Sequence, residues 1–203
     1  MSVEIRAIAL DAPGVRLEPL SEQHREGLRL ASDAAVIWAH MPVDASGGGF
    51  DPWFDAALDA GACGAAAVWA VRTLDDGAVV GSTRFLAVEA AHRRVEIGHT
   101  WYAPTVWGTR VNPACKWALM DYGFEALKLN RIELKTDVRN LRSQAAIAGL
   151  GATREGVLRA HMIRRDGSLR DTVYFSVVRP EWPSVRDRLL ARLAAPAVSQ
   201  EKS

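Results

Sequence analysis

Asn140 and Ser143 form the clearest chemical pair in the chain, an amide and a hydroxyl spaced three residues apart. They follow a run, 131–138, whose alternating apolar and polar side chains predict a strand, and they stand at the start of a short helix expected at 139–147. A polar pair at such a strand-to-helix turn can contact a molecule that lies against a neighbouring parallel strand. Structural alternatives stay open, because Asn140 could serve only as a helix cap and Ser143 only as a first-turn residue.

A second stretch suits the binding of an anion. Asn112 in the capping position and Pro113 after it predict that a helix begins there and runs to residue 127. Free N–H groups and the positive end of the helix dipole converge on the preceding loop, which can therefore hold a phosphate without a side-chain charge. The residues of this loop are Trp107, Gly108, Thr109, Arg110, Val111 and Asn112, of which Arg110 would add attraction.

Three other side chains could move a proton or attack a substrate. His99 could act as a base, although a histidine in a strand is more often only packed or hydrogen-bonded. Glu155 could act as a base or could be a surface carboxylate at a strand end. Cys115 near a helix N-terminus could be a nucleophile, but we expect it in the core. Of the 7 tryptophans, those expected near an acceptor site are Trp38, Trp53 and Trp101.

The elements that must position these residues read β-β-β-α-β-α-β-β from residue 65 onward. Strands are expected at 15–20, 65–71, 78–86, 92–102, 131–138, 155–162 and 169–178, a short one within 3–10, and helices at 22–32, 51–61, 113–127, 139–147 and 184–193. This order predicts an α/β fold with a mixed, mostly antiparallel sheet and helices on both faces. We expect a lead-in at 1–13, one domain at 14–183, and a C-terminal helix with a disordered tail at 184–203.

Composition excludes several classes of protein. The 203 residues carry 25 basic and 24 acidic side chains, a net charge of +1, which favours neither nucleic acid nor an anionic membrane as a partner. Cys63 and Cys115 are far apart and no histidine stands at metal-ligand spacing, so we expect reduced thiols, no metal and a cytoplasmic location. No stretch approaches the ~18 apolar residues of a membrane span.

A series of short motifs covers most of the chain in a fixed order. They are Glu96-Ile97-Gly98, Trp107-Gly108-Thr109 with Asn112, Asn140-x-x-Ser143, Gly149-x-Gly151-Ala152, Glu155-Gly156-Val157-Leu158-Arg159, Asp166-Gly167, Arg170-Asp171 and Glu181-Trp182. In these motifs the chain resembles the GNAT superfamily of acetyl-CoA-dependent N-acetyltransferases, in the branch related to the ribosomal-protein N-terminal acetyltransferases.

The resemblance implies a site for acetyl-CoA. The strands at 95–102 and 131–138 would start side by side and splay apart, and pantetheine would fill the gap, paired with the main chain of His99, Thr100 and Trp101. The pyrophosphate would lie on the loop at 107–112, and Asn140 would bond the pantetheine arm. A backbone N–H near Thr100 would stabilise the oxyanion, and Ser143 would protonate the leaving thiolate.

Two departures from the family pattern bear on function. The usual pyrophosphate loop has Gln or Arg, then Gly, then Gly or Ala where this chain has Trp107, Arg110 and Asn112. A glutamate proposed as base in the ribosomal enzymes would fall near Met162, where this chain has no carboxylate, so the base, or a water relay, stays open. We expect an N-acetyltransferase that moves the acetyl group to a primary amine, a protein N-terminus or a small molecule, by direct attack in a ternary complex. The alternative is a weak or inactive CoA-binding module, and homodimer formation is left open.

Overall fold

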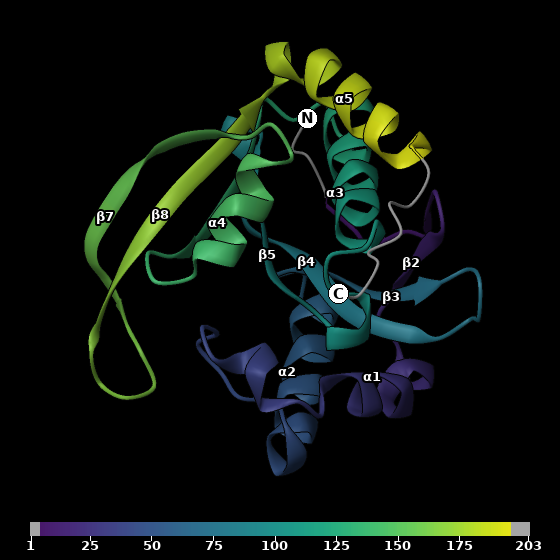
Figure 1. Ribbon diagram of the computed structural model, residues 1–203, viewed down its shortest axis with the longest axis vertical. Helices are drawn as coiled ribbons and strands as arrows, with labels where there is room; N and C mark the ends of the chain where they lie inside the picture. Colours follow the sequence, from purple (N-terminus) through teal and green to yellow (C-terminus); the bar gives the residue numbers. More distant parts are fainter. Residues whose placement is uncertain (1–4, 196–203) are drawn as a thin grey trace, which may run out of the picture.

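One eight-stranded sheet runs through the computed structural model, which describes residues 5–195 (Figure 1). Its strands are β1 (Leu10–Ala12), β2 (Val15–Pro19), β3 (Ala67–Thr73), β4 (Val79–Glu89), β5 (Arg94–Tyr102), β6 (Arg131–Asp137), β7 (Thr153–Ile163) and β8 (Leu169–Val178). The helices are α1 (Arg25–Ser32), α2 (Phe50–Ala62), α3 (Val111–Asp121), α4 (Leu141–Ala148) and α5 (Trp182–Ala194).

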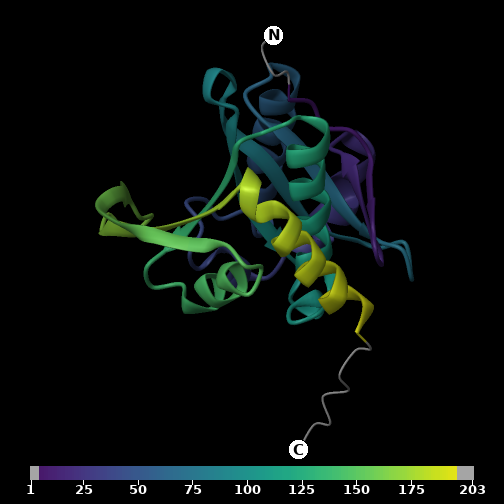
Figure 2. The same cartoon turned by 90° about the horizontal axis from the view of Figure 1, so that it is seen from above.

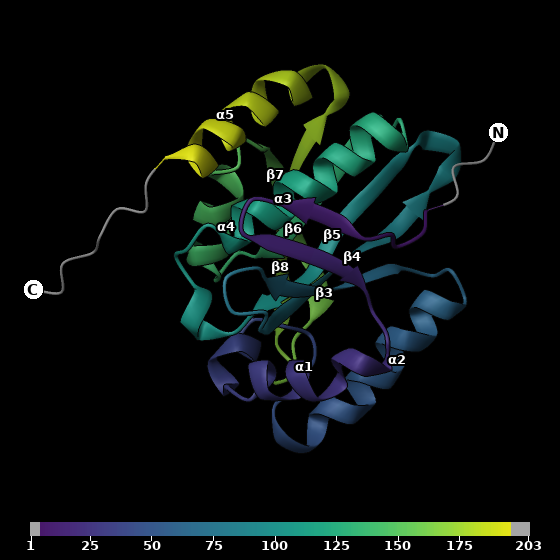
Figure 3. The same ribbon diagram turned by 90° about the vertical axis from the view of Figure 1, so that its right-hand side faces the viewer.

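The strands lie in the order β1-β2-β3-β4-β5-β6-β8-β7, and β5 with β6 is the parallel pair among otherwise antiparallel neighbours. Helices α1 and α2 cover one face of the sheet, whereas α3 and α5 pack on the other (Figure 3). Helix α4 packs beside β6 and β8. The predicted mixed sheet with helices on both faces and one parallel pair is therefore confirmed.

Helix α3 begins two residues earlier than the sequence predicts. Arg110 caps it, so Asn112 and Pro113 are its second and third residues, and it ends at Asp121 before a π-helical turn at Tyr122–Ala126. Proline is accepted at this position because the N–H groups of a first helical turn have no acceptor within the helix. The N-terminal strand also differs, since it is Leu10–Ala12 rather than within 3–10, and the predicted tail at 196–203 lies outside the described residues.

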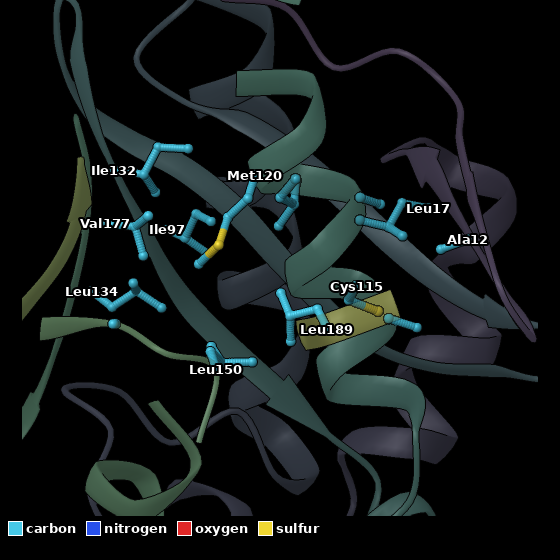
Figure 4. Packing of buried hydrophobic residues seen from close by; sticks show 14 of the residues in the cluster. Ala12, Leu17, Ile97, Cys115, Met120, Ile132, Leu134, Leu150, Val177 and Leu189 are labelled. Carbon is cyan, nitrogen blue, oxygen red and sulfur yellow. The ribbon is translucent and has the colours of Figure 1, made fainter. Parts of the chain in front are cut away.

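The main hydrophobic core fills the space between the sheet, α3 and α5. In Figure 4, Ile97 of β5 and Leu134 of β6 point toward Met120 and Leu189, which come from α3 and α5. A second cluster on the opposite face joins α1 and α2 to the sheet and includes Trp38, Phe50, Trp53, Phe54 and Trp101. Because β5 contributes to both clusters, this strand is packed against side chains on both of its faces.

Strands β7 and β8 form a long hairpin that is joined to the sheet by the pairing of β8 with β6 and extends to one side of the molecule (Figure 2). The tip of this hairpin turns toward the segment after α1, where Arg165 Nη1 lies 2.6 Å from Asp44 Oδ2 and Arg165 also donates to the carbonyl of Trp38. The hairpin tip thus forms one wall of the space above β5 and β6.

Candidate active site

β5 and β6 separate after three paired positions. Arg94, Val95 and Glu96 pair with Arg131, Ile132 and Glu133, and from 97 onward no strand within 5–195 pairs with β5 on this side. Its other edge stays bonded to β4 as far as Tyr102. The predicted splaying is confirmed, and it leaves those backbone N–H and C=O groups of 97–102 that do not bond β4 facing a gap in which another chain of amides could pair.

The gap opens into a pocket of about 320 Å³. Its floor is β5 and the second half of β6, and its other walls are the loop before α3, helix α4, the segment 36–42 and the hairpin residues Met162 and Arg170. The pocket thus joins one end, at α3 and α4, to a second end beside the segment 36–42 and the hairpin, so two ligands that enter from different ends can meet in it. We call the second end the acceptor end.

A β-bulge at His99 decides which way the side chains of β5 point. Between the pairs Arg84 with Gly98 and Ser82 with Trp101, β5 has one residue more than β4, and His99 takes a left-handed backbone conformation with φ of 46°. The extra residue reverses the alternation of side chains along the strand. Trp101 therefore lies at the acceptor end rather than on the face of Ile97.

Thr100 lies on the opposite face of β5 from Trp101 and contacts α3. Its hydroxyl lies 2.8 Å from that of Thr83 and accepts a hydrogen bond from Lys116 Nζ at 2.6 Å. Lys116 is 5% exposed, lines the pocket, and has its pKa lowered to about 7 by burial. Sequence reasoning missed Lys116, although a lysine one turn before Met120 on an apolar helix face is a signal.

The loop before α3 keeps some of its N–H groups free. Among residues 5–195, no acceptor lies near the backbone N–H of Gly108, Arg110 or Asn112, and Gly108 and Asn112 line the pocket. Thr109 instead closes the loop, since its hydroxyl donates to the Val106 carbonyl and accepts from the N–H of Val111.

Arg110 does not point into the pocket. Its Nη1 donates to the Leu193 carbonyl at 3.5 Å, and neither Arg110, Thr109 nor Val111 is part of the lining. The cation beside the loop is Arg142 of α4, which sequence reasoning missed. Its guanidinium lies 3.5 Å from the centre of the Trp107 ring, and both residues line the pocket.

Asn140 and Ser143 lie together at the start of α4 and both line the pocket. Asn140 caps the helix, because its Oδ1 accepts the Ser143 N–H at 3.0 Å. The cap occupies only one atom of the amide. Its Nδ2 and the Ser143 hydroxyl have no hydrogen-bond partner within the described part of the chain, so both can serve a ligand.

Glu96 brings a carboxylate into the pocket. It is 4% exposed, its Oε2 lies 2.7 Å from Lys135 Nζ, and burial raises its pKa although Lys135 opposes the shift. A Cβ at residue 98 would lie 2.6 Å from Glu96 Oε1, so Gly98 makes room for this carboxylate. The sequence contained Glu96-Ile97-Gly98 as a motif, but no chemical role was predicted for Glu96.

The structure separates the other two predicted proton-transfer residues. His99 lines the pocket, and burial together with the charge of Arg84 lowers its pKa to about 4, so its ring is neutral at pH 7. Glu155 lies outside the pocket lining, at the start of β7, where it pairs with Arg131 and accepts from the Ser176 hydroxyl at 2.8 Å. The hydrogen bond from Arg131 holds the pKa of Glu155 low.

The expected tryptophans gather beside the acceptor end. The Trp101 ring lies 5.2 Å from Trp38 and 5.3 Å from Trp53, between ring centres. Cys115, by contrast, is fully buried in the main core as expected, and burial raises its pKa to about 12. A thiol so far from ionisation does not act as a nucleophile at neutral pH.

The described residues show neither a metal-binding cluster nor a membrane-spanning helix. Within 5–195, no three His, Cys, Asp or Glu side chains lie together in a way that could hold a metal ion. No helix in this range is both long and apolar enough to cross a membrane.

The fold and the splayed site agree with the comparisons with known proteins. The family model described as acetyltransferase (GNAT) domain matches residues 15–153. This chain belongs to that family, and GNAT proteins transfer an acetyl group from acetyl-CoA.

Individual relatives show the same likeness. The chain is 32% identical over 112 residues to the uncharacterized N-acetyltransferase YoaA of Bacillus subtilis (strain 168), a match of 55% of this chain and 62% of that protein. It is 32% identical over 109 residues to the putative ribosomal N-acetyltransferase YdaF of the same organism, 54% of this chain and 58% of that protein. The match thus spans less than two thirds of either relative.

Solved structures extend the likeness to nearly the whole chain. A GCN5-related N-acetyltransferase from Brucella melitensis superposes with a TM-score of 0.89 at 28% identity, over 98% of this chain and 93% of that one. Mycobacterium smegmatis RimJ in complex with CoA-disulfide superposes with a TM-score of 0.73 at 23% identity, over 91% and 93%, and shares the fold.

Proposed function

We propose that this protein acetylates a primary amine, a protein N-terminus or a small molecule, by direct attack on acetyl-CoA in a ternary complex. The observation that carries the proposal is the unpaired edge of β5 at 97–102, which faces a pocket large enough for a cofactor arm and an acceptor. The RimJ structure, of the same fold, holds a CoA derivative, which supports the assignment.

The residues of the pocket fit acetyl-CoA along its length. The pantetheine amides would pair with the main chain of His99, Thr100 and Trp101, and Asn140 would donate its Nδ2 to the same arm. The pyrophosphate would accept from the free N–H groups of the 107–112 loop, with the guanidinium of Arg142 beside it.

Glu96 is the group that we assign as general base. The reaction forms a bond between the amine nitrogen and the acetyl carbon, breaks the bond from that carbon to sulfur, and moves one proton off the nitrogen. A buried carboxylate of raised pKa accepts that proton near neutral pH better than His99, whose pKa is about 4. Glu155 receives no role, because it is paired with Arg131 outside the pocket.

Thr100 and Ser143 would stabilise the other two charges that form in the reaction, on the oxyanion and on the departing thiolate. The backbone N–H near Thr100 would donate to the oxyanion of the tetrahedral intermediate. The hydroxyl of Ser143 would donate to the departing thiolate, or protonate it and be reprotonated by solvent.

Two measurements test the proposed function. Calorimetry should show binding of acetyl-CoA, and a thiol-release assay should show turnover with at least one member of a panel of amino acids, polyamines, aminoglycosides and N-terminal peptides. Intersecting double-reciprocal lines are expected for a ternary complex, whereas parallel lines would indicate a covalent shuttle and contradict direct attack. Tight CoA binding with no thiol release for any amine would favour the CoA-binding module instead.

A further inference from the structure

Arg84 of β4 is a buried cation without a counter-charge. It is 8% exposed, and within 5–195 neither its Nε nor its Nη2 has a hydrogen-bond partner and no carboxylate lies within ion-pair distance. Its Cζ lies 6.0 Å from the centre of the Trp53 ring. Burial of an unpaired guanidinium costs desolvation free energy, and a bound anion would offset this cost. The surroundings of Arg84 therefore suit an anionic ligand.

Arg84 is not itself part of the pocket lining but lies directly behind lining residues of the acceptor end. It pairs across the strands with Gly98, and its charge contributes to the lowered pKa of His99, which lines the pocket. The preceding residue, Thr83, points to Lys116 on α3, so Arg84 points to the opposite face, where Trp53 and Trp101 lie.

Arg170 of β8 brings a second incompletely paired guanidinium to the same end. It is 8% exposed and lines the pocket, and its Nε has no hydrogen-bond partner in the part of the chain that the structure describes. The nearest carboxylate, Asp137, is 3.9 Å away and already accepts from Arg164 at 2.7 and 2.9 Å. Asp137 therefore does not neutralise Arg170 fully.

Most of the unpaired buried groups around the acceptor end are hydrogen-bond donors, although His99 Nδ1 also has no partner within 5–195 and can donate or accept in a neutral ring. Besides the two arginines, the indole N–H groups of Trp53 and Trp101 are buried without an acceptor. Arginine and tryptophan side chains can only donate hydrogen bonds. Glu96 is the acidic residue of the lining, and it is held by Lys135. An occupant that satisfies this end must be rich in acceptors and negatively charged.

We propose, resting on the proposed acetyltransferase function, that the acceptor is a primary amine that carries a carboxylate, held by Arg84 and Arg170. A carboxylate offers two coplanar oxygens that match the fork of a guanidinium. The carboxylate can be that of a free amino acid or the side chain of an acidic N-terminal residue in a peptide. In both cases the anion holds the amine near Glu96.

Matched pairs of acceptors test the inference in the unmodified enzyme. The first pair is a set of amino acids against their primary amides, and the second is a peptide amide that begins with Asp against one that begins with Asn. The expected result is a kcat/KM at least about tenfold higher for the carboxylate member of one pair, and the pair that responds identifies the source of the carboxylate. Equal rates in both pairs while thiol release proceeds would overturn the inference and leave the acetyltransferase function standing.

Two variants locate the preference. Arg84→Met and Arg170→Met should each reduce the preference for the carboxylate by about tenfold or more through KM of the acceptor, with KM for acetyl-CoA unchanged. Arg159→Met, which removes an exposed arginine of β7 outside the pocket lining, is the control and should keep the preference. Retention of the full preference in both variants would contradict the assignment.

Thermal unfolding supplies a readout without turnover. Because Arg84→Met removes an unpaired buried charge, this variant should melt at a higher temperature than the parent without ligand, and Arg84→Lys should not. A lower melting temperature for Arg84→Met would indicate a structural role and overturn the inference. In the parent with saturating CoA, the responding amino acid should raise the melting temperature and its amide should not, an effect that both Met variants should lose.

An acceptor bearing phosphate rather than carboxylate is distinguished by a further pair. O-phosphoethanolamine is compared with ethanolamine under the same conditions. A preference confined to the phosphate would overturn the carboxylate assignment. Absence of both thiol release and CoA binding would instead contradict the proposed function. Equal rates within the pairs, by contrast, would contradict only the inference about the acceptor.

Discussion

Glu96 Oε2 and Lys135 Nζ lie 2.7 Å apart at the point where β5 and β6 separate. Glu96 is the last residue of β5 that pairs with β6, and Lys135 stands two residues beyond its partner Glu133. The ion pair therefore spans the start of the gap and holds a carboxylate at its base. The arrangement keeps Glu96 ionisable although it is 4% exposed.

Replacement of this carboxylate should affect the chemical step. Glu96→Gln is expected to lower kcat by roughly two to four powers of ten with little change in KM for acetyl-CoA, because a general base acts only during proton transfer. Glu155→Gln is the matched comparison and should retain activity within about threefold. The reverse result, a large loss only in Glu155→Gln, would move the base to Glu155.

The pH dependence of activity should reflect the interaction between Glu96 and Lys135. Burial raises the pKa of Glu96, and the hydrogen bond and charge of Lys135 oppose this shift. A base must be unprotonated, so kcat/KM should fall as pH falls through the pKa of Glu96. Lys135→Met removes the opposing interaction and should move this acid limb to higher pH. If the acid limb stays at the same pH in Lys135→Met, then this limb does not arise from the titration of Glu96.

Ser143 should matter to the departure of the thiol. Its hydroxyl has no partner in the described part of the chain and faces the pocket. Ser143→Ala is expected to lower kcat by roughly one to three powers of ten, since it removes a donor used chiefly in the transition state. Steady-state kinetics at saturating amine would measure the effect, and turnover at the parental rate would leave Tyr102 or water as the next donor to test.

Asn140 has two functions that two substitutions can separate. Asn140→Ser keeps a neutral oxygen that can cap α4 but loses the Nδ2 donor, so KM for acetyl-CoA should rise roughly three- to tenfold with little change in kcat, the effect of one hydrogen bond of about 1 kcal/mol. Asn140→Ala should show the same kinetic change and also lose about 1 kcal/mol of folding stability. Unchanged KM in both variants would limit Asn140 to capping.

Lys116 should make stability depend on pH in the alkaline range. Burial lowers its pKa to about 7 from an ordinary value of 10.5. Between these values the unfolded chain binds the extra proton, so the contribution of Lys116 to stability rises with pH over this window and is flat below it. Lys116→Met should remove that slope and raise the free energy of unfolding at pH 7 by about 1 to 3 kcal/mol. Urea unfolding of both proteins at several pH values measures the difference, and a destabilised variant would contradict the prediction.

Local patterns were enough to predict much of the molecule. The alternation in 131–138 and the position of Asn140 after it predicted β6, the turn and the start of α4, because strand period and helix capping depend on neighbouring residues. The motif order predicted the parallel pair and the gap. The boundary at Val111 was missed, since proline is compatible with several positions in a first turn.

Tertiary structure decided which of these residues meet. The bulge at His99 turns Trp101 toward Trp53, and no rule of alternation indicates the extra residue. Glu96 and Arg170 line one pocket although they lie on different strands, and Arg84 lies beside it through its pairing with Gly98, an arrangement that follows from the sheet order and from the separation of β5 and β6. Whether a charge is buried without a partner depends on groups distant in the sequence. The sequence by itself therefore determined the family, the elements and the turn between β6 and α4, whereas the placement of Glu96 and of the unpaired arginines came only from the folded chain.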